Sequence, residues 1–192
     1  MINIDIVKII SDIISLAAMA FAILSYQQKK QRSIIFFQLI ATSLFSVSFF
    51  MIGAMTGCLL NVISVIRALL FMYKKQLKTD NIFWLIGFIA IYITTYILTF
   101  TVFGKEFNLL NAIIELFPVI GMTGSTFGFR AKTAKGSRIG GLINEPSWLV
   151  YNIVNLSPGA IGCNVFSTIS IIIGFIRHDR KKVKEENNGM QE

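Results

Sequence analysis

The segment Asn61-Val62-Ile63-Ser64-Val65-Ile66 recurs 103 residues later as Asn164-Val165-Phe166-Ser167-Thr168-Ile169. At the same offset Phe45 corresponds to Trp148, so each asparagine follows an aromatic residue by 16 positions. Both copies lie in apolar stretches that end in a cation. The sequence therefore predicts a duplicated helical unit with one amide buried in each copy, a plan on which many transporters are built.

The composition indicates an integral membrane protein. Of the 192 residues, 54% are hydrophobic and only 15% are charged, too few to cover a soluble surface. Mean hydropathy is +0.67, and several apolar stretches reach roughly 20 residues, the length of a bilayer-crossing helix. These stretches are nearly continuous, whereas a membrane β-barrel needs short segments of alternating polarity. We therefore expect an all-α protein whose main partner is the lipid bilayer.

Seven spans are expected in one integral membrane domain, 1–192. They cover residues 6–26, 34–54, 56–73, 82–103, 107–128, 139–157 and 159–176. The domain divides into a first three-helix bundle at 1–78, a linker helix at 79–104, a second three-helix bundle at 105–179 and a basic, polar tail at 180–192. Because the linker crosses the membrane once, both bundles have the same orientation, as parallel repeats about an axis along the membrane normal.

Lysine and arginine predict the orientation. The loops after the first, third and fifth spans, together with the C-terminal tail, hold 15 of the 18 cations, all on one side of a seven-span chain. By the positive-inside rule the N-terminus lies outside and the C-terminus lies in the cytoplasm. The net charge of +8 is thus explained by orientation, and we expect no nucleic-acid partner.

Polar side chains inside the spans are the candidate binding residues, because they are expensive to place in lipid. Asn61, Asn164 and Asn152 fall in the outer half of their spans, and Trp148 falls near the midplane. With Phe45, they offer aromatic faces and amides that suit a small polar solute. As an equal alternative to binding a solute, the side chains of the two repeated asparagines form hydrogen bonds between helices.

Three charged residues within the spans are also candidates. Arg67 and Glu145 lie at the same predicted depth, so we expect an ion pair between the bundles, either a cytoplasmic gate or a static salt bridge. Glu115 is a candidate for proton coupling, or else a bonding group beside the helix break at Pro118.

Enzymatic chemistry is not expected. His178 is the only histidine and follows the last span, so no histidine-based metal site or catalytic triad is predicted. No nucleophile, base and acid converge, and we expect no metal, no cofactor and no catalytic residue. The sequence leaves open whether the protein forms a homo-oligomer.

The chain resembles the YgjV-type family of small bacterial inner-membrane proteins and, more broadly, the SWEET and PQ-loop transporter superfamily. The supporting motifs are Ser25-Tyr26-Gln27, Asn61-Val62-Ile63-Ser64 with Arg67, and Glu145-Pro146-Ser147-Trp148-Leu149-Val150-Tyr151-Asn152. The narrow resemblance covers most of the chain and implies a multi-pass protein of the bacterial inner membrane. The broad one implies a SWEET-like plan of three, one and three helices.

In sugar-transporting relatives of that superfamily, a tryptophan and an asparagine from each bundle enclose the substrate. This implies Trp148, Asn164 and Asn61 here, with Phe45 in the remaining aromatic place. The Pro-Gln hinge pair of the superfamily is Tyr26-Gln27 in this chain. The resemblance implies a small-solute transporter or facilitator with alternating access between the repeats; the alternative is a non-transporting accessory protein that uses the same fold to bind other membrane proteins.

Overall fold

The computed structural model describes residues 2–52, 55–154 and 158–179, and within them every regular element is a helix. The helices are α1 (Ile2–Tyr26), α2 (Gln31–Met51), α3 (Met55–Met72), α4 (Lys74–Leu77), α5 (Ile82–Thr101), α6 (Leu109–Arg130), α7 (Ala134–Val154), α8 (Pro158–Gly174) and the π-helix η1 (Phe175–Asp179). The all-helical prediction is confirmed. The short helix α4 was not predicted, and the predicted tail at 180–192 lies outside the described residues.

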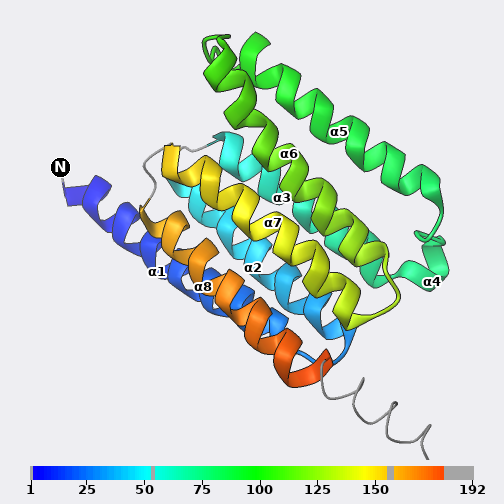
Figure 1. Cartoon of the computed structure of the whole chain (residues 1–192). Coiled ribbons are helices and arrows are strands. Elements are labelled where there is room, and N and C mark those ends of the chain that lie inside the picture. The colour runs from blue at the N-terminus through cyan, green and yellow to red at the C-terminus, as the bar shows by residue number, and fades with distance from the viewer. Residues whose placement is uncertain (1, 53–54, 155–157, 180–192) are drawn as a thin grey trace, which may run out of the picture.

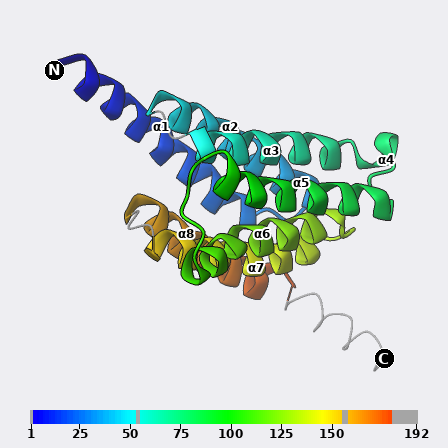
Figure 2. The ribbon, with the colours of Figure 1, turned by 90° about the horizontal axis from the view of Figure 1, so that it is seen from above.

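The long helices form two groups of three that face each other (Figure 1; Figure 2). In the first group α2 packs against α1 and α3, and in the second α7 packs against α6 and α8. Between the groups, α1 contacts α8, α2 contacts α7 and α3 contacts α6. These pairings are unchanged when α1, α2 and α3 are exchanged for α6, α7 and α8, which agrees with the sequence repeat. Helix α5 lies outside both groups and packs on α6.

The helices of each group run in the same sequence of directions. Helices α1, α3, α6 and α8 all end at one end of the bundle, where α2, α5 and α7 begin (Figure 1). The cation-rich loops that follow α1, α3 and α6 therefore gather there, and we call this the basic end. Two helices begin with an asparagine cap. At the start of α5 the side chain of Asn81 accepts from the Phe83 N–H, and at the start of α6 the side chain of Asn108 accepts from the Asn111 N–H.

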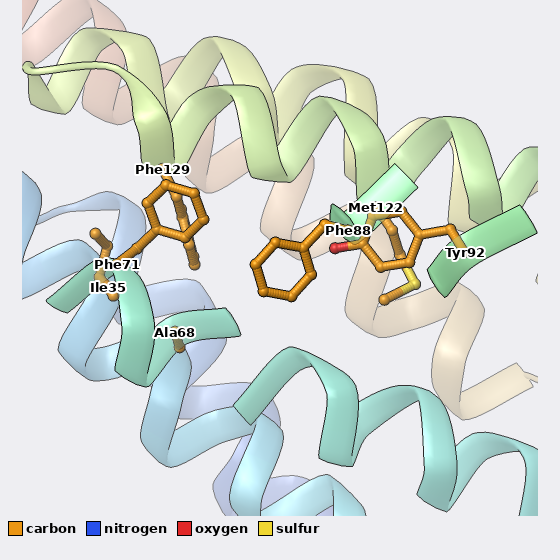
Figure 3. Packing of buried hydrophobic residues seen from close by; sticks show 7 residues of the cluster. All are labelled: Ile35, Ala68, Phe71, Phe88, Tyr92, Met122 and Phe129. Carbon is orange, nitrogen blue, oxygen red and sulfur yellow. The ribbon is translucent and has the colours of Figure 1, made fainter. Parts of the chain in front are cut away.

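The largest apolar core lies between α2, α3, α5 and α6. It consists of Ile35, Ala68, Phe71, Phe88, Tyr92, Met122 and Phe129 (Figure 3). Phe71 meets both Phe88 and Phe129 with ring centroids 6.1 Å apart. The outside of the bundle is also apolar: Phe83 is 74% exposed and Leu109 is 79% exposed. An apolar exterior around an apolar core is what a bilayer solvent requires.

Within the described residues, five helical segments are long and apolar enough to cross a membrane. They are Ile6–Tyr26, Gln31–Met51, Ile82–Thr101, Leu109–Arg130 and Ala160–Asp179. The apolar part of α3 is shorter, Cys58–Met72. Helix α7 is long enough, but it carries many glycines and polar residues and is not one of the five. The described helices thus support a polytopic membrane protein, and seven spans in a 3+1+3 plan remain a prediction.

Helices α6 and α7 approach each other through glycines. A Cβ atom on Gly140 would lie 2.6 Å from the carbonyl oxygen of Gly124 and 2.7 Å from the Cα of Gly128. One on Gly128 would lie 2.9 Å from the Cα of Gly140. The obstructing atoms are backbone atoms, which cannot move aside without separating the helices. Small residues allow this close contact, which supplies packing where water does not drive association.

We expect Gly140→Ala to lower the free energy of unfolding by about 1–3 kcal/mol, because the added methyl group forces α6 and α7 apart. Gly87→Ala on α5 is the matched control, since a Cβ there meets nothing within 4 Å. It should leave stability unchanged or raise it slightly. Reversible unfolding in mixed detergent micelles measures both. Equal stability of the two variants would contradict the close helix contact.

Candidate functional site

Polar residues recur every seventh position along α7. Arg138, Glu145 and Asn152 are each two helical turns apart, so they share one face of the helix. That face turns toward α1 and α8, as the hydrogen bonds of all three residues show. Arg138 is fully buried and Glu145 is 8% exposed. A charged stripe inside a membrane protein is a functional candidate by default.

The carboxylate of Glu145 is held by three different side chains. Its Oε1 atom accepts from the Tyr26 hydroxyl of α1 at 3.1 Å and from Nδ2 of Asn144 at 3.2 Å. Its Oε2 atom accepts from Nδ2 of Asn164 on α8 at 2.9 Å. Tyr26 and Asn164 are themselves buried. The carboxylate is therefore removed from solvent and surrounded by neutral donors.

Asn164 bridges this carboxylate to a further amide. Its Oδ1 atom accepts from Nδ2 of Asn152 at 2.8 Å, while its own amide group donates to Glu145. We call Tyr26, Asn144, Glu145, Asn152 and Asn164 the amide–carboxylate cluster. The structure thus joins three predicted site residues, Glu145, Asn152 and Asn164, in one hydrogen-bonded set.

Two members of the cluster were missed by sequence reasoning. Tyr26 comes from the end of α1, 119 positions before Glu145, and no local pattern connects them. Asn144 was overlooked beside its charged neighbour. The seven-residue spacing of Arg138, Glu145 and Asn152 is the signal that would have placed the site on one face of α7.

The predicted aromatic pair, Phe45 and Trp148, makes its ring contacts with residues outside this cluster. Phe45 on α2 stacks on Phe49 of the same helix with centroids 6.1 Å apart. Trp148 on α7 meets Tyr151 edge-on at 5.6 Å and packs against the apolar core. Among the described ring contacts, Phe45 and Trp148 do not meet each other. Asn61 lies half-buried on α3.

The predicted Arg67–Glu145 ion pair is not formed in this structure, where both residues are described. Arg67 is 5% exposed, and its Nη1 atom donates to the Met122 carbonyl oxygen at 3.1 Å and to the Tyr92 hydroxyl at 3.3 Å. Its guanidinium lies 5.1 Å from the centre of the Phe129 ring. The pair fails because α3 packs on α6, whereas the polar face of α7 turns to α1 and α8.

Glu115, the candidate for proton coupling, is buried on α6 and forms an ion pair with Lys105. It also lines a narrow cavity of about 20 Å³ between α3, α5 and α6, together with Tyr92, Thr95 and Thr99. A cavity of that size holds about one water molecule. Glu115 therefore belongs to a different part of the protein from the amide–carboxylate cluster.

A second buried ion pair lies at the basic end. Nη1 of Arg138 contacts Asp179 of η1 at 2.8 Å, Nε donates to the Tyr26 carbonyl oxygen at 2.9 Å, and Nη2 donates to the Gln28 carbonyl oxygen. One guanidinium thus joins α7, the end of α1 and η1. In the described residues no group of three or more His, Cys, Asp or Glu side chains is placed to hold a metal ion.

The amide–carboxylate cluster offers both donors and acceptors in a solvent-poor setting. An amide both donates and accepts, and a carboxylate can take up a proton or accept from a bound polar group. In a low-dielectric interior such bonds are stronger, and an unsatisfied partner costs more. The cluster thus gathers one carboxyl group, three amides and a phenol hydroxyl that can exchange hydrogen-bond partners within the bundle.

Comparison of the chain with models of protein families finds a match to one family. The model of the family Imp-YgjV, described as bacterial inner membrane protein, matches residues 9–182. No curated protein and no solved structure matches the chain.

Asn164→Ala should lower the free energy of unfolding by about 1–3 kcal/mol, because it leaves one carboxylate oxygen of Glu145 and the Asn152 amide without partners. Thr94→Ala is the control: Thr94 is exposed on α5, and its hydroxyl bonds only to the Ala90 carbonyl of the same helix. We expect it to change stability by less than about 0.5 kcal/mol. Reversible unfolding in detergent micelles measures both changes. Equal free energies of unfolding for the two variants would contradict the bridging role of Asn164.

A double-mutant cycle tests the separation of Arg67 from Glu145. The effects of Arg67→Met and Glu145→Gln on the free energy of unfolding should add to within about 0.5 kcal/mol, since the two residues share no hydrogen-bond partner. The cycle of Arg138→Met and Asp179→Asn is the positive control, and its coupling should exceed about 1 kcal/mol. A coupling of that size between Arg67 and Glu145 would restore the predicted gate pair.

Proposed function

We propose that this chain, which belongs to the Imp-YgjV family of bacterial inner membrane proteins, is a transporter or facilitator of a small polar solute. In this proposal the two groups of helices alternate access to a central site, and the protein crosses the inner membrane seven times with its basic end in the cytoplasm. The observation that carries the proposal is the hydrogen bond between Tyr26 and Glu145, which joins the two groups inside the bundle.

The position of this bond gives it a role in movement. Tyr26 belongs to the first group of helices, whereas Glu145, Asn152 and Asn164 belong to the second. A shift of one group against the other would change the partners of the carboxylate, as alternating access requires. A solute with hydroxyl or amino groups could then replace the phenol as donor to Glu145. Buried ionisable residues in membrane proteins commonly mark such solute or proton paths.

Further residues have assigned roles in the proposal. Asn152 and Asn164 are the amides that contact the solute, with Phe45, Asn61 and Trp148 retained from the sequence as additional contacts. Glu115 is the candidate for proton coupling, because its buried carboxylate lines a cavity large enough for water. The pair Arg138–Asp179 takes the place of the predicted Arg67–Glu145 gate, since it ties α7, α1 and η1 at the basic end.

One observation favours the alternative of a non-transporting membrane accessory protein. The amide of Asn164 donates to Glu145 and its oxygen accepts from Asn152, so the side chain is satisfied within the protein. A cluster closed in this way can simply bind helices together. The experiment must therefore separate a binding role of these amides from a structural one.

The test is a thermal-stability screen of the purified protein in detergent with sugars, amino acids and vitamin precursors. A compound that binds the folded state raises the melting temperature by mass action, by an amount equivalent to about 2.7 kcal/mol at 100 times its dissociation constant. We expect such a compound to stabilise the wild type but not the variant carrying Asn152→Ala and Asn164→Ala. The control variant carries Thr94→Ala and Thr101→Ala, two exposed hydroxyls bonded only within α5.

The stabilising compound is then offered to proteoliposomes. Its uptake should fall at least tenfold in the double-asparagine variant and stay at the wild-type level in the threonine control. Binding without uptake by the wild type would favour the accessory protein. Equal stabilisation of all three proteins would remove the cluster from solute binding, and a panel with no stabilising compound would count against the transporter.

A further inference from the structure

We propose that the basic end carries a binding site for a phosphate-type anion, supplied either by an anionic phospholipid headgroup or by a free phosphate-bearing solute. The site is an open cavity of about 460 Å³. It is lined by the loop between α1 and α2, the first turn of α2 and η1. Its volume falls in the range of ligand pockets, roughly 300–1,000 Å³. The site is separate from the amide–carboxylate cluster, and it does not depend on solute transport.

The lining is positively charged. Lys29, Lys30 and Arg177 line the cavity, and no acidic residue does so among the described residues. The ion pairs of the described residues leave all three cations without an acidic partner within 4.0 Å. The acidic residue on η1, Asp179, is already paired with Arg138. The cavity therefore gathers positive charge that the described protein does not neutralise.

In the other repeat, the cation equivalent to Arg177 is neutralised by an acidic residue. Lys74 corresponds to Arg177 at the 103-residue offset. It pairs with Asp80 at 2.9 Å and donates to the Ala131 carbonyl oxygen at 2.8 Å, so it caps the end of α6. Arg177 has no such contact among the described hydrogen bonds, because Arg138 has taken over the capping of α1. Of the two equivalent cations, Lys74 is therefore paired and caps a helix, whereas Arg177 has no acidic partner among the described residues.

Three backbone acceptors at the end of α1 and just after it already have donors. The carbonyl oxygens of Tyr26 and Gln28 accept from Arg138. The Gln27 carbonyl oxygen lies 3.0 Å from Nε2 of His178, and because a carbonyl can only accept, this nitrogen carries the hydrogen. The groups left to meet a ligand are mainly donors.

The start of α2 adds a further donor set. Helix α2 begins after Lys30 with no side-chain cap and no acidic residue in its first turn, and Ser33 of that turn lines the cavity. The first N–H groups of a helix have no partner within the helix, and its positive dipole end attracts anions. Phosphate groups bind at such helix starts. Basic pockets at the ends of membrane helices likewise hold anionic lipid headgroups.

The test compares thermal stability of the purified full-length protein with four additives at equal ionic strength. Two of them are inorganic phosphate and chloride, and two are the short-chain lipids dihexanoyl phosphatidylglycerol and dihexanoyl phosphatidylcholine. The site variant carries Lys29→Gln and Arg177→Gln. The control variant carries Lys75→Gln and Lys132→Gln, which removes the same charge from exposed residues at the same end. Both variants should fold, since none of the four side chains has a described hydrogen bond or ion pair to lose.

We expect phosphatidylglycerol or phosphate to raise the melting temperature of the wild type and the control. The half-saturating concentration should rise about 30-fold in the site variant, from the loss of two cations. Stabilisation by phosphatidylglycerol without an effect of phosphate assigns the site to a lipid headgroup, and stabilisation by phosphate assigns it to a phosphate-bearing solute. The proposal is overturned if neither anion stabilises the wild type, or if the site and control variants lose the effect equally.

Discussion

The clamp formed by Arg138 holds the basic end of the bundle together. Its fully buried guanidinium donates to two carbonyl oxygens at the end of α1 and pairs with Asp179 on η1. The last carbonyl oxygens of a helix have no donor within the helix, and a buried guanidinium needs acceptors. The Arg138 guanidinium and these carbonyl oxygens therefore satisfy each other. Two features depend on this clamp. The backbone of Tyr26 is fixed by Arg138 while its hydroxyl reaches Glu145, and the carbonyl oxygen of Gln28, which lines the cavity of the proposed anion site, already accepts from Arg138.

The chemistry of α7 follows from its place in the bundle. It contacts α6, α8 and α2, so little of it needs to be apolar to face lipid. Glycines on one side bring α6 close enough for backbone contact, and the polar face on the other side finds its partners in α1 and α8. This explains why the helix with the most functional candidates has the weakest resemblance to a membrane span. A polar helix is stable within the membrane when its neighbours satisfy it.

The sequence predicted the helical class, a repeat and some of the buried polar residues, because hydrophobic length and polarity are local properties of a sequence. Asn152, Asn164 and Glu145 were predicted as site residues, and the structure brings them together. The pairing of Arg67 with Glu145 was wrong for this structure, because equal depth does not fix the rotation of a helix about its axis. Tyr26 could not be predicted as a partner, since the contact joins distant segments. Arg138 was counted as a loop cation, and only the packing of η1 and α1 around it shows that it is buried.

The duplicated fold carries different chemistry in its two halves. Phe45 and Trp148 and the two repeated asparagines keep the pattern, but Glu145 corresponds to Thr42 and Asn152 to Phe49. Conversely, Arg67 corresponds to Ser170, which bonds the Ile23 carbonyl oxygen of α1. Arg67 and Ser170 thus both join one group of helices to the other, but only Arg67 carries a charge; Thr42, the counterpart of Glu145, bonds within its own helix. The duplicated scaffold therefore carries the amide–carboxylate cluster at only one of two equivalent places, between α1, α7 and α8. The cluster thus lies on the α1–α8 side of the bundle, whereas the α3–α6 side carries the aromatic core and the guanidinium of Arg67 over the Phe129 ring.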